Sequence, residues 1–252
     1  MPNFIDFSNK TILITGASSG IGRTTALLLD QLGAKCILVA RREKELNQTA
    51  DDMKNAARVY PFDLEKVESI AQWISQIIEE NGPLDGYVHC AGIAITSALR
   101  GIQLSMLDKS MRINFYSFLE IIKQISRPGQ FNENMSIVGI SSIAAQQGNS
   151  GKTIYSATKA AMDAAVRCLA KELTRKKIRV NSVAPALIHT EIYDNLMERA
   201  ADSEQVQAVL SRQYLGLGEP VDVANMAVFL LSPASKFTTG ATLPVDGGRL
   251  SS

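Results

Sequence analysis

The stretch Thr15-Gly16-Ala17-Ser18-Ser19-Gly20-Ile21-Gly22 joins a short apolar run at residues 11–14 to a helical pattern at residues 21–32. Glycines at such a junction let the backbone turn tightly and approach a pyrophosphate, which then lies among the free N–H groups of the helix N-terminus. The first two glycines are further apart than in the common Gly-x-Gly-x-x-Gly pattern. The stretch predicts a dinucleotide-binding turn made by Gly16, Ser18, Ser19, Gly20, Ile21 and Gly22.

The rest of the chain alternates short β-branched runs with longer amphipathic ones. Strands are predicted at residues 11–14, 36–40, 59–60, 87–88, 136–140, 178–183 and 241–245, and helices at 21–32, 43–55, 67–80, 102–126, 153–175 and 221–231. This alternation predicts an α/β fold with a doubly wound parallel sheet of about seven strands and helices on both faces. We expect a single domain over residues 1–252.

One segment, at about residues 190–217, interrupts this alternation. An insertion of this length between a strand and the last helix is a candidate lid over a substrate site. An ordinary pair of surface helices would give the same pattern. Both interpretations stay open on the sequence alone.

Composition excludes several classes of function. The chain has 252 residues, 46% of them hydrophobic, with 26 basic and 25 acidic side chains and a net charge of +1. With this balance of charges, the chain has no excess of positive charge to bind a nucleic acid or an anionic membrane surface. No apolar run in the sequence is long enough to span a membrane. Three widely spaced cysteines form no metal-ligand or disulfide pattern, which suits a reducing cytoplasm. We expect a cytoplasmic protein without a metal site.

A tyrosine and a lysine lie four residues apart in the helical pattern at residues 153–175, at Tyr155 and Lys159. Side chains at this spacing share one face of a helix. A neighbouring ammonium group is expected to lower the pKa of the phenol, which could then exchange a proton near neutral pH. The spacing alone is also typical of a solvated helix surface.

The glycine turn followed by Tyr-x-x-x-Lys resembles the classical short-chain dehydrogenase/reductase family over nearly the whole chain. The resemblance implies a Rossmann-type fold. It also implies a catalytic set in which Ser142, preferred to its neighbour Ser141, and Asn114 join Tyr155 and Lys159.

The resemblance further implies cofactor contacts outside the glycine turn and the catalytic pair, at Asp63, Leu64, Cys90, Ala91, Gly92, Pro185, Ile188 and Thr190. Two positions depart from the family pattern. His89-Cys90 stands where the family has two asparagines, and Ala186 replaces a glycine after Pro185. We expect His89 to be a packing residue rather than a catalytic one. The departures bear on cofactor affinity more than on the chemistry.

The end of the second predicted strand bears on the choice of nicotinamide cofactor. A carboxylate there pairs with the ribose 2′-hydroxyl of NAD, whereas arginine suits the 2′-phosphate of NADP. The chain has Ala40 where relatives that use NAD carry aspartate, followed by Arg41 and Arg42. Two guanidinium groups can hold a phosphate through forked hydrogen bonds, although arginines are also common in solvated loops. We expect NADP(H) in preference to NAD(H), with Arg41 the more important contact.

The expected reaction is hydride transfer between the nicotinamide and a small-molecule ketone or secondary alcohol. A 3-oxoacyl thioester, free or bound to a carrier protein, is the expected substrate, and Lys176 lies where such reductases carry a basic docking residue. A sugar, a steroid or another small ketone is the alternative. A reading from another class is a catalytically silent NADP-binding sensor or scaffold. The resemblance also implies a homotetramer, or a homodimer.

Overall fold

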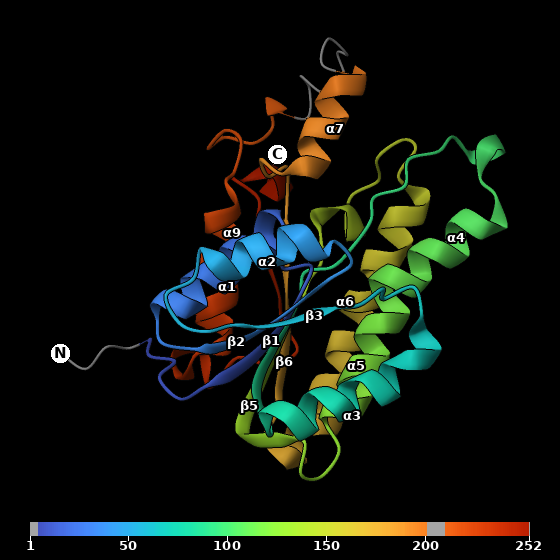
Figure 1. Ribbon diagram of the computed structural model, residues 1–252. Helices are drawn as coiled ribbons and strands as arrows, with labels where there is room; N and C mark the ends of the chain where they lie inside the picture. Colours follow the sequence, from blue (N-terminus) through green and yellow to red (C-terminus); the bar gives the residue numbers. More distant parts are fainter. Residues whose placement is uncertain (1–4, 201–209, 252) are drawn as a thin grey trace.

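The computed structural model describes residues 5–200 and 210–251, and within them the chain forms one seven-stranded sheet (Figure 1). Its order is β3-β2-β1-β4-β5-β6-β7, and every neighbouring pair is parallel. The strands are β1 (Thr11–Thr15), β2 (Lys35–Ala40), β3 (Arg58–Pro61), β4 (Leu84–His89), β5 (Phe131–Ile140), β6 (Arg179–Pro185) and β7 (Thr242–Val245). The predicted fold class is confirmed.

Helices cover both faces of the sheet (Figure 1). One layer contains α1 (Gly20–Gln31), α2 (Glu43–Asp51) and α9 (Pro220–Leu231); the other contains α3 (Ile70–Asn81), α4 (Leu104–Met111), α5 (Ser117–Ile125) and α6 (Thr153–Leu173). A further helix, α7 (Glu191–Ala200), extends beyond the sheet where β6 ends. None of the helices described is long and apolar enough to cross a membrane.

The core is two apolar clusters, one on each face of the sheet. On one face Ile74 of α3, Phe118 of α5 and Met162 of α6 are buried against the strands. On the other, Leu29 of α1 and Val223 of α9 are buried. Since the sheet is covered on both sides, β1 and β2 carry the nearly continuous apolar runs that are typical of buried parallel strands.

The order of the sheet reverses between β1 and β4. The chain moves outward from β1 through β2 to β3, and then returns to place β4 on the other side of β1. In open parallel sheets, ligands bind in the crevice at the carboxyl ends of the strands beside such a reversal. The glycine turn after β1 and residues 90–92 after β4 flank this point.

The continuous helix predicted at residues 102–126 is wrong in one respect. The structure divides it into α4, a π-helical segment at Arg112–Tyr116, and α5. A π segment widens the helix locally and is common at functional sites. Here it contains Asn114, whose side chain bonds to the loop after β4 and to α6 as well as to Ser110 of α4.

The second predicted helix is shorter than expected, because α2 ends at Asp51 instead of residue 55. The carboxylate of Asp30 accepts hydrogen bonds from the backbone N–H groups of Lys54 (2.7 Å) and Asn55 (2.9 Å). These groups are therefore satisfied by a side chain of α1, and the chain leaves the helix early.

Candidate active site

The glycine turn brings the backbones of β1 and β4 close together. Gly16 has a φ angle of 68°, and a Cβ atom there would lie 2.8 Å from the amide nitrogen of Ala91. A Cβ atom at Gly22 would overlap the carbonyl oxygen of Gly16. Only glycine avoids these collisions, so the tight backbone turn inferred from the sequence is present.

The N-terminus of α1 begins at this turn. Within the described chain no side chain caps it, and its first turn contains no acidic residue. The first N–H groups of a helix have no partner within it. Such a terminus can hold a phosphate through these donors and the helix dipole.

His89 closes β4 and is fully buried. Its Nδ1 atom lies 2.6 Å from the Tyr87 hydroxyl and 3.2 Å from the Thr15 hydroxyl. Burial lowers the pKa of His89 to about 3, so the ring is neutral at physiological pH. The predicted packing role of His89 is confirmed.

Residues 90–92 follow β4 and lie against the end of β1. Thr15 accepts hydrogen bonds from the N–H of Cys90 at its carbonyl (3.3 Å) and from the N–H of Ala91 at its hydroxyl (3.4 Å). Burial raises the pKa of the Cys90 thiol to about 12. The Cys90 thiol therefore stays neutral and packs against the end of β1, and it is not a nucleophile.

Asn114 is fully buried in the π segment and joins three parts of the site. Its Oδ1 atom accepts from the N–H of Ile93 (2.8 Å), and its Nδ2 atom donates to the Ile93 carbonyl (2.9 Å) and the Thr158 hydroxyl (2.9 Å). Asn114 therefore fixes the loop after β4 to α6, the helix that carries Tyr155 and Lys159.

Gly92 borders both Asn114 and Lys159. A Cβ atom at Gly92 would lie 3.4 Å from Asn114 Oδ1 and also 3.4 Å from Lys159 Nζ. The loop after β4 therefore lies directly against both polar side chains.

Ser142, Tyr155 and Lys159 meet where β5 ends. Ser142 is the second residue after β5, and its hydroxyl accepts a hydrogen bond from the N–H of Ala144 (3.1 Å). Tyr155 lies in the first turn of α6 and is half-buried. Lys159 is buried one turn later, where its Nζ atom donates to the carbonyl of Ile140 (2.6 Å) and lies 5.7 Å from the centre of the Tyr155 ring.

Burial dominates the electrostatics of this pair. It raises the pKa of Tyr155, and the neighbouring Ser142 hydroxyl only partly opposes the shift. Burial also lowers the pKa of Lys159 to about 8, against the opposing charge of Asp163. The prediction that Lys159 lowers the tyrosine pKa is therefore wrong for the protein alone: desolvation of the phenolate outweighs an ammonium group at this separation.

Asp163 is a buried member of the site that the sequence analysis missed. It lies one turn after Lys159 on α6, and it accepts a hydrogen bond from the hydroxyl of Ser182 in β6 (2.9 Å). The Ser182 hydroxyl in turn lies 2.8 Å from that of Thr242 in β7. Burial raises the pKa of Asp163, whereas its hydroxyl partners and Lys159 lower it. The four-residue spacing from Lys159 was the available signal.

The two arginines after β2 are both exposed at the same edge of the sheet. Arg42 donates from Nη2 to the hydroxyl of Ser19 in the glycine turn (2.9 Å). Beyond β3, Asp63 accepts at Oδ1 from the N–H of Glu65 (3.1 Å), and Leu64 is buried. The strand order β3-β2-β1 brings these predicted contacts to one side of the glycine turn.

The chain after β6 folds back over the glycine turn. The carbonyl of Pro185 lies 3.5 Å from the Ser142 hydroxyl, which donates to it. Ile188 is buried and pairs with residue 218. The Thr190 methyl group would lie 3.2 Å from a Cβ atom at Gly20. Of the three predicted contact positions, residue 190 lies beside the glycine turn, residue 185 contacts Ser142, and residue 188 is buried against residue 218.

Gln213 is a second residue that the sequence analysis missed. This buried glutamine accepts from the N–H of Leu187 (2.8 Å) and donates to the carbonyls of Leu187 (3.2 Å) and Gly216 (2.9 Å). It therefore fixes the two ends of the predicted lid region. α7 forms the first part of that region, whereas residues 201–209 lie outside the described residues.

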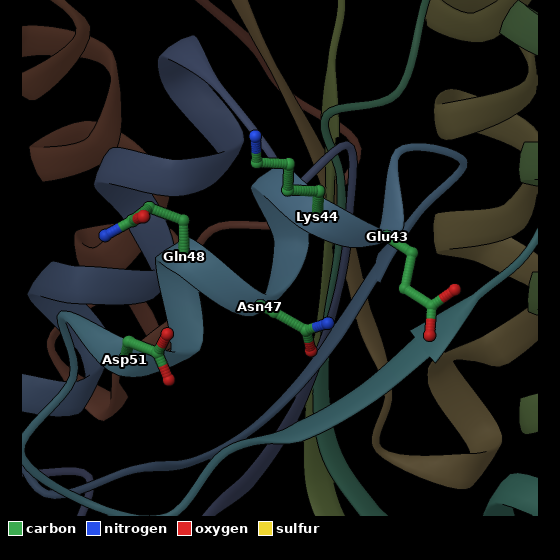
Figure 2. A pocket seen from close by; sticks show the side chains of 5 residues that line it. All are labelled: Glu43, Lys44, Asn47, Gln48 and Asp51. Carbon is green, nitrogen blue, oxygen red and sulfur yellow. The ribbon is translucent and has the colours of Figure 1, made fainter.

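A shallow hollow on the surface of α2 lies apart from this arrangement. Figure 2 shows its lining side chains, all of which are exposed and come from the one helix: Glu43, Lys44, Asn47, Gln48 and Asp51. None of the residues that meet at the carboxyl edge of β5 lines it. We assign it no part in the chemistry.

Comparisons with known proteins agree with this geometry. A protein-family model described as enoyl-(acyl carrier protein) reductase matches residues 16–249. The L-xylulose reductase of Caenorhabditis elegans is 36% identical over 253 residues, which cover 98% of each chain. The 3-oxoacyl-(acyl-carrier-protein) reductase of Thermotoga maritima is 32% identical over 243 residues, which cover 95% of this chain and 97% of the relative.

Two solved structures with bound cofactors have the same fold. A 7α-hydroxysteroid dehydrogenase complexed with NADH and 7-oxo glycochenodeoxycholic acid is 28% identical, with a TM-score of 0.89 over 97% of this chain and 96% of that one. A blue fluorescent protein from a metagenomic library, in complex with NADPH, is 28% identical, with a TM-score of 0.87 over 96% of this chain and 98% of that one. Matched over nearly its whole length, the chain belongs to the short-chain dehydrogenase/reductase family, whose members are oxidoreductases of carbonyl and alcohol groups.

Proposed function

We propose that the protein reduces a small ketone with NADPH, or runs the reverse oxidation. The observation that carries this proposal is the meeting of Ser142, Tyr155 and Lys159 at the end of β5, with Asn114 joining their helix to the loop beside the glycine turn. A silent sensor has no need of all four polar groups so placed. The proposal treats them as the catalytic set.

Tyr155 is the proton donor in this scheme. Its raised pKa keeps the phenol protonated at neutral pH, so it can give a proton to a carbonyl oxygen as negative charge develops there. The Ser142 hydroxyl would hydrogen-bond the same oxygen, an interaction that is strongest where water is excluded. The bound nicotinamide supplies the hydride. Lys159, whose Nζ atom lies 5.7 Å from the centre of the Tyr155 ring, would return a proton to Tyr155, and Asn114 would position their helix through Thr158.

The residues present fit a nicotinamide dinucleotide. The uncapped N-terminus of α1 and the turn at residues 16–22 would hold the pyrophosphate. Asp63 and Leu64 would contact the adenine, and residues 90–92 the adjoining ribose. Tyr155, Lys159, Pro185, Ile188 and Thr190 would surround the nicotinamide end. Arg41 and Arg42, with no carboxylate at position 40, support a 2′-phosphate.

A small polar ketone is the substrate class we favour. The loop between Ser142 and Tyr155 has the sequence Gln-Gln-Gly-Asn-Ser-Gly-Lys at residues 146–152. Lys152 donates to the hydroxyl of Thr96, in the chain that follows β4 (2.7 Å). Polar side chains between Ser142 and Tyr155 suit a polyhydroxy ketone, and the name L-xylulose reductase of one relative agrees with this choice.

A 3-oxoacyl thioester is the second candidate, supported by the name of another relative. Lys176, the residue expected to dock a carrier protein, is exposed and donates from Nζ to the carbonyl of Ser126 just beyond α5 (2.8 Å). An ammonium group has three donors, so this contact leaves two for an acidic carrier.

A cofactor and substrate screen tests the proposal. NADPH is expected to raise the melting temperature more than NADH, and Arg41→Ala is expected to remove that difference. NADPH oxidation is then measured with L-xylulose, a 3-oxoacyl thioester and a steroid ketone. Faster turnover of the thioester would favour the second candidate. A thermal shift with NADPH but no oxidation with any carbonyl would instead support the sensor.

The proposed assembly is a homotetramer, with a homodimer as the smaller alternative, in the cytoplasm. β7 lies at the edge of the sheet, and near it Phe237 is fully exposed and Phe229 partly exposed. An edge strand with apolar neighbours is suited to contact with another copy. Sedimentation equilibrium would give the mass, and a monomer would exclude this assembly.

A further inference from the structure

An exposed ion pair links the end of β2 to the first residue of α7. Arg42 Nη2 donates to both carboxylate oxygens of Glu191, each at 3.0 Å, and to the Ser19 hydroxyl at 2.9 Å. The two ion-pair partners are 149 positions apart in the sequence. One guanidinium nitrogen therefore bridges the glycine turn and the helix that follows β6.

The bridge lies where a dinucleotide must pass. Ser19 belongs to the turn proposed to hold the pyrophosphate, and the neighbour of Glu191, Thr190, packs over Gly20. The side chains of Arg42 and Glu191 are 43% and 55% exposed, so an incoming anion can reach either one. The other guanidinium terminus, Nη1, has a carboxylate oxygen of Glu45 at 4.0 Å.

An arginine cannot use the same N–H groups for a carboxylate and a phosphate. A phosphate monoester carries about two negative charges near neutral pH and has three acceptor oxygens, so it can displace a single carboxylate. Breaking the ion pair between Arg42 and Glu191 costs free energy, and this cost weakens the binding of the phosphate by the same amount. NAD has a neutral hydroxyl at this place and would leave the pair intact.

We propose that Glu191 is a specificity-determining residue, which competes with the 2′-phosphate of NADP(H) for Arg42 and thereby weakens NADP(H) binding without affecting NAD(H). This inference rests on the proposed 2′-phosphate site at Arg41 and Arg42. It adds that phosphate binding releases the first turn of α7 from the glycine turn. Glu191 acts through Arg42 and touches no reacting atom.

Dissociation constants of NADPH and NADH, measured by fluorescence titration, test this role. Glu191→Gln is expected to lower the NADPH constant by up to about fivefold, the value of an exposed ion pair, and to leave the NADH constant unchanged. Asp194→Asn is the matched control. It removes the same charge one turn along α7, where Asp194 faces His189 (3.6 Å), and should change neither constant.

A double-mutant cycle locates the effect. In an Arg42→Ala background, Glu191→Gln should no longer change the NADPH constant, because its partner is gone. If Glu191→Gln raised the dissociation constants of NADPH and NADH equally, the ion pair would be a contact that both cofactors need, and the proposal would be overturned. Equal changes in Glu191→Gln and Asp194→Asn would show a general charge effect, and would also overturn it.

Failure of the underlying cofactor assignment has a different signature. An unchanged NADPH constant in both Arg41→Ala and Arg42→Ala would overturn the 2′-phosphate site itself. A wild-type protein that prefers NADH, but shifts toward NADPH in Glu191→Gln alone, would contradict the proposed cofactor preference and still support the competition by Glu191.

Discussion

The two ends of the proposed cofactor site are built in different ways. At the catalytic end, Asn114 is fully buried and Lys159 is 3% exposed, and both are held by backbone carbonyls or buried partners. At the phosphate end, Arg42 and Glu191 are about half exposed and contact each other through flexible side chains. Buried groups act through desolvation and fixed geometry, whereas exposed charges are screened by salt and contribute little singly. Rate should therefore depend on the first end and cofactor selectivity on the second.

The largest effect is expected at the catalytic end, from Tyr155→Phe. Loss of the proton donor should lower kcat by about 100- to 10,000-fold, as general acid catalysis is typically worth. The dissociation constant of NADPH should stay close to that of the parent. Steady-state kinetics and fluorescence titration measure the two quantities. A variant with near-parental turnover would remove Tyr155 from the chemistry.

Gly16→Ala tests whether the close approach of β1 and β4 holds both ends together. The left-handed conformation alone should cost about 1–2 kcal/mol of unfolding free energy, and the contact with Ala91 should add to it. Cofactor binding should fall as well. Chemical denaturation and NADPH titration measure these losses.

Gly129→Ala is the matched control for this change. Gly129 also has a positive φ angle, 83°, but nothing lies within 4 Å of its added Cβ atom. It should lose stability through backbone strain alone and keep its NADPH affinity. Equal losses in the two variants would show that conformation, rather than the approach to β4, decides the effect.

The pH profile tests the role of Lys159. Because its pKa is lowered to about 8, the ammonium form is lost above that pH. The kcat/KM for NADPH, which reports groups of the free enzyme, should fall about tenfold per pH unit beyond it. The Lys159→Met variant should have a low kcat/KM that does not fall further above this pH. No limb is expected from His89, which stays neutral above about pH 3.

Stability gives an independent measure of the same shift. Between about pH 8 and the ordinary lysine value of 10.5, the folded state has released a proton that the unfolded state still binds. The free energy of unfolding contributed by Lys159 should therefore rise with pH across this interval. Lys159→Met should lack the rise, and identical profiles would place the pKa of Lys159 near its ordinary value.

The smallest effect is expected from salt at the phosphate end. Raising the ionic strength should weaken NADPH binding more than NADH binding, because the extra phosphate contacts exposed arginines. Turnover at saturating NADPH should change little, since the catalytic groups are buried. Titration at two salt concentrations measures the first point. Equal salt dependence of the two cofactors would place the selective charge elsewhere.

Local spacing made much of the catalytic end predictable. The glycine turn, the strand alternation and the Tyr155–Lys159 pair follow periodic rules that a sequence displays directly. The raised pKa of Tyr155 did not follow, because the pattern shows which charge is near but not how much water is excluded. Asp163 was missed for the same reason: its importance lies in burial against hydroxyls of β6 and β7.

The phosphate end was less predictable. Arg41 and Arg42 could be identified by their place after a strand, but the partner of Arg42 could not. Glu191 is brought to it by the return of the chain after β6, and no periodicity relates residues so far apart. Gln213 is similar, since its three contacts are made to loop backbone.

The π segment at Arg112–Tyr116 has a consequence for protein engineering. A π turn is in effect one residue inserted into an α-helix, and its removal lets the regular hydrogen-bond ladder close. Deleting one residue here would make α4 and α5 a more regular helix. The same deletion would rotate Asn114 away from Ile93 and Thr158 and leave a buried amide without partners. Regularising this helix is therefore a change that a designer should avoid.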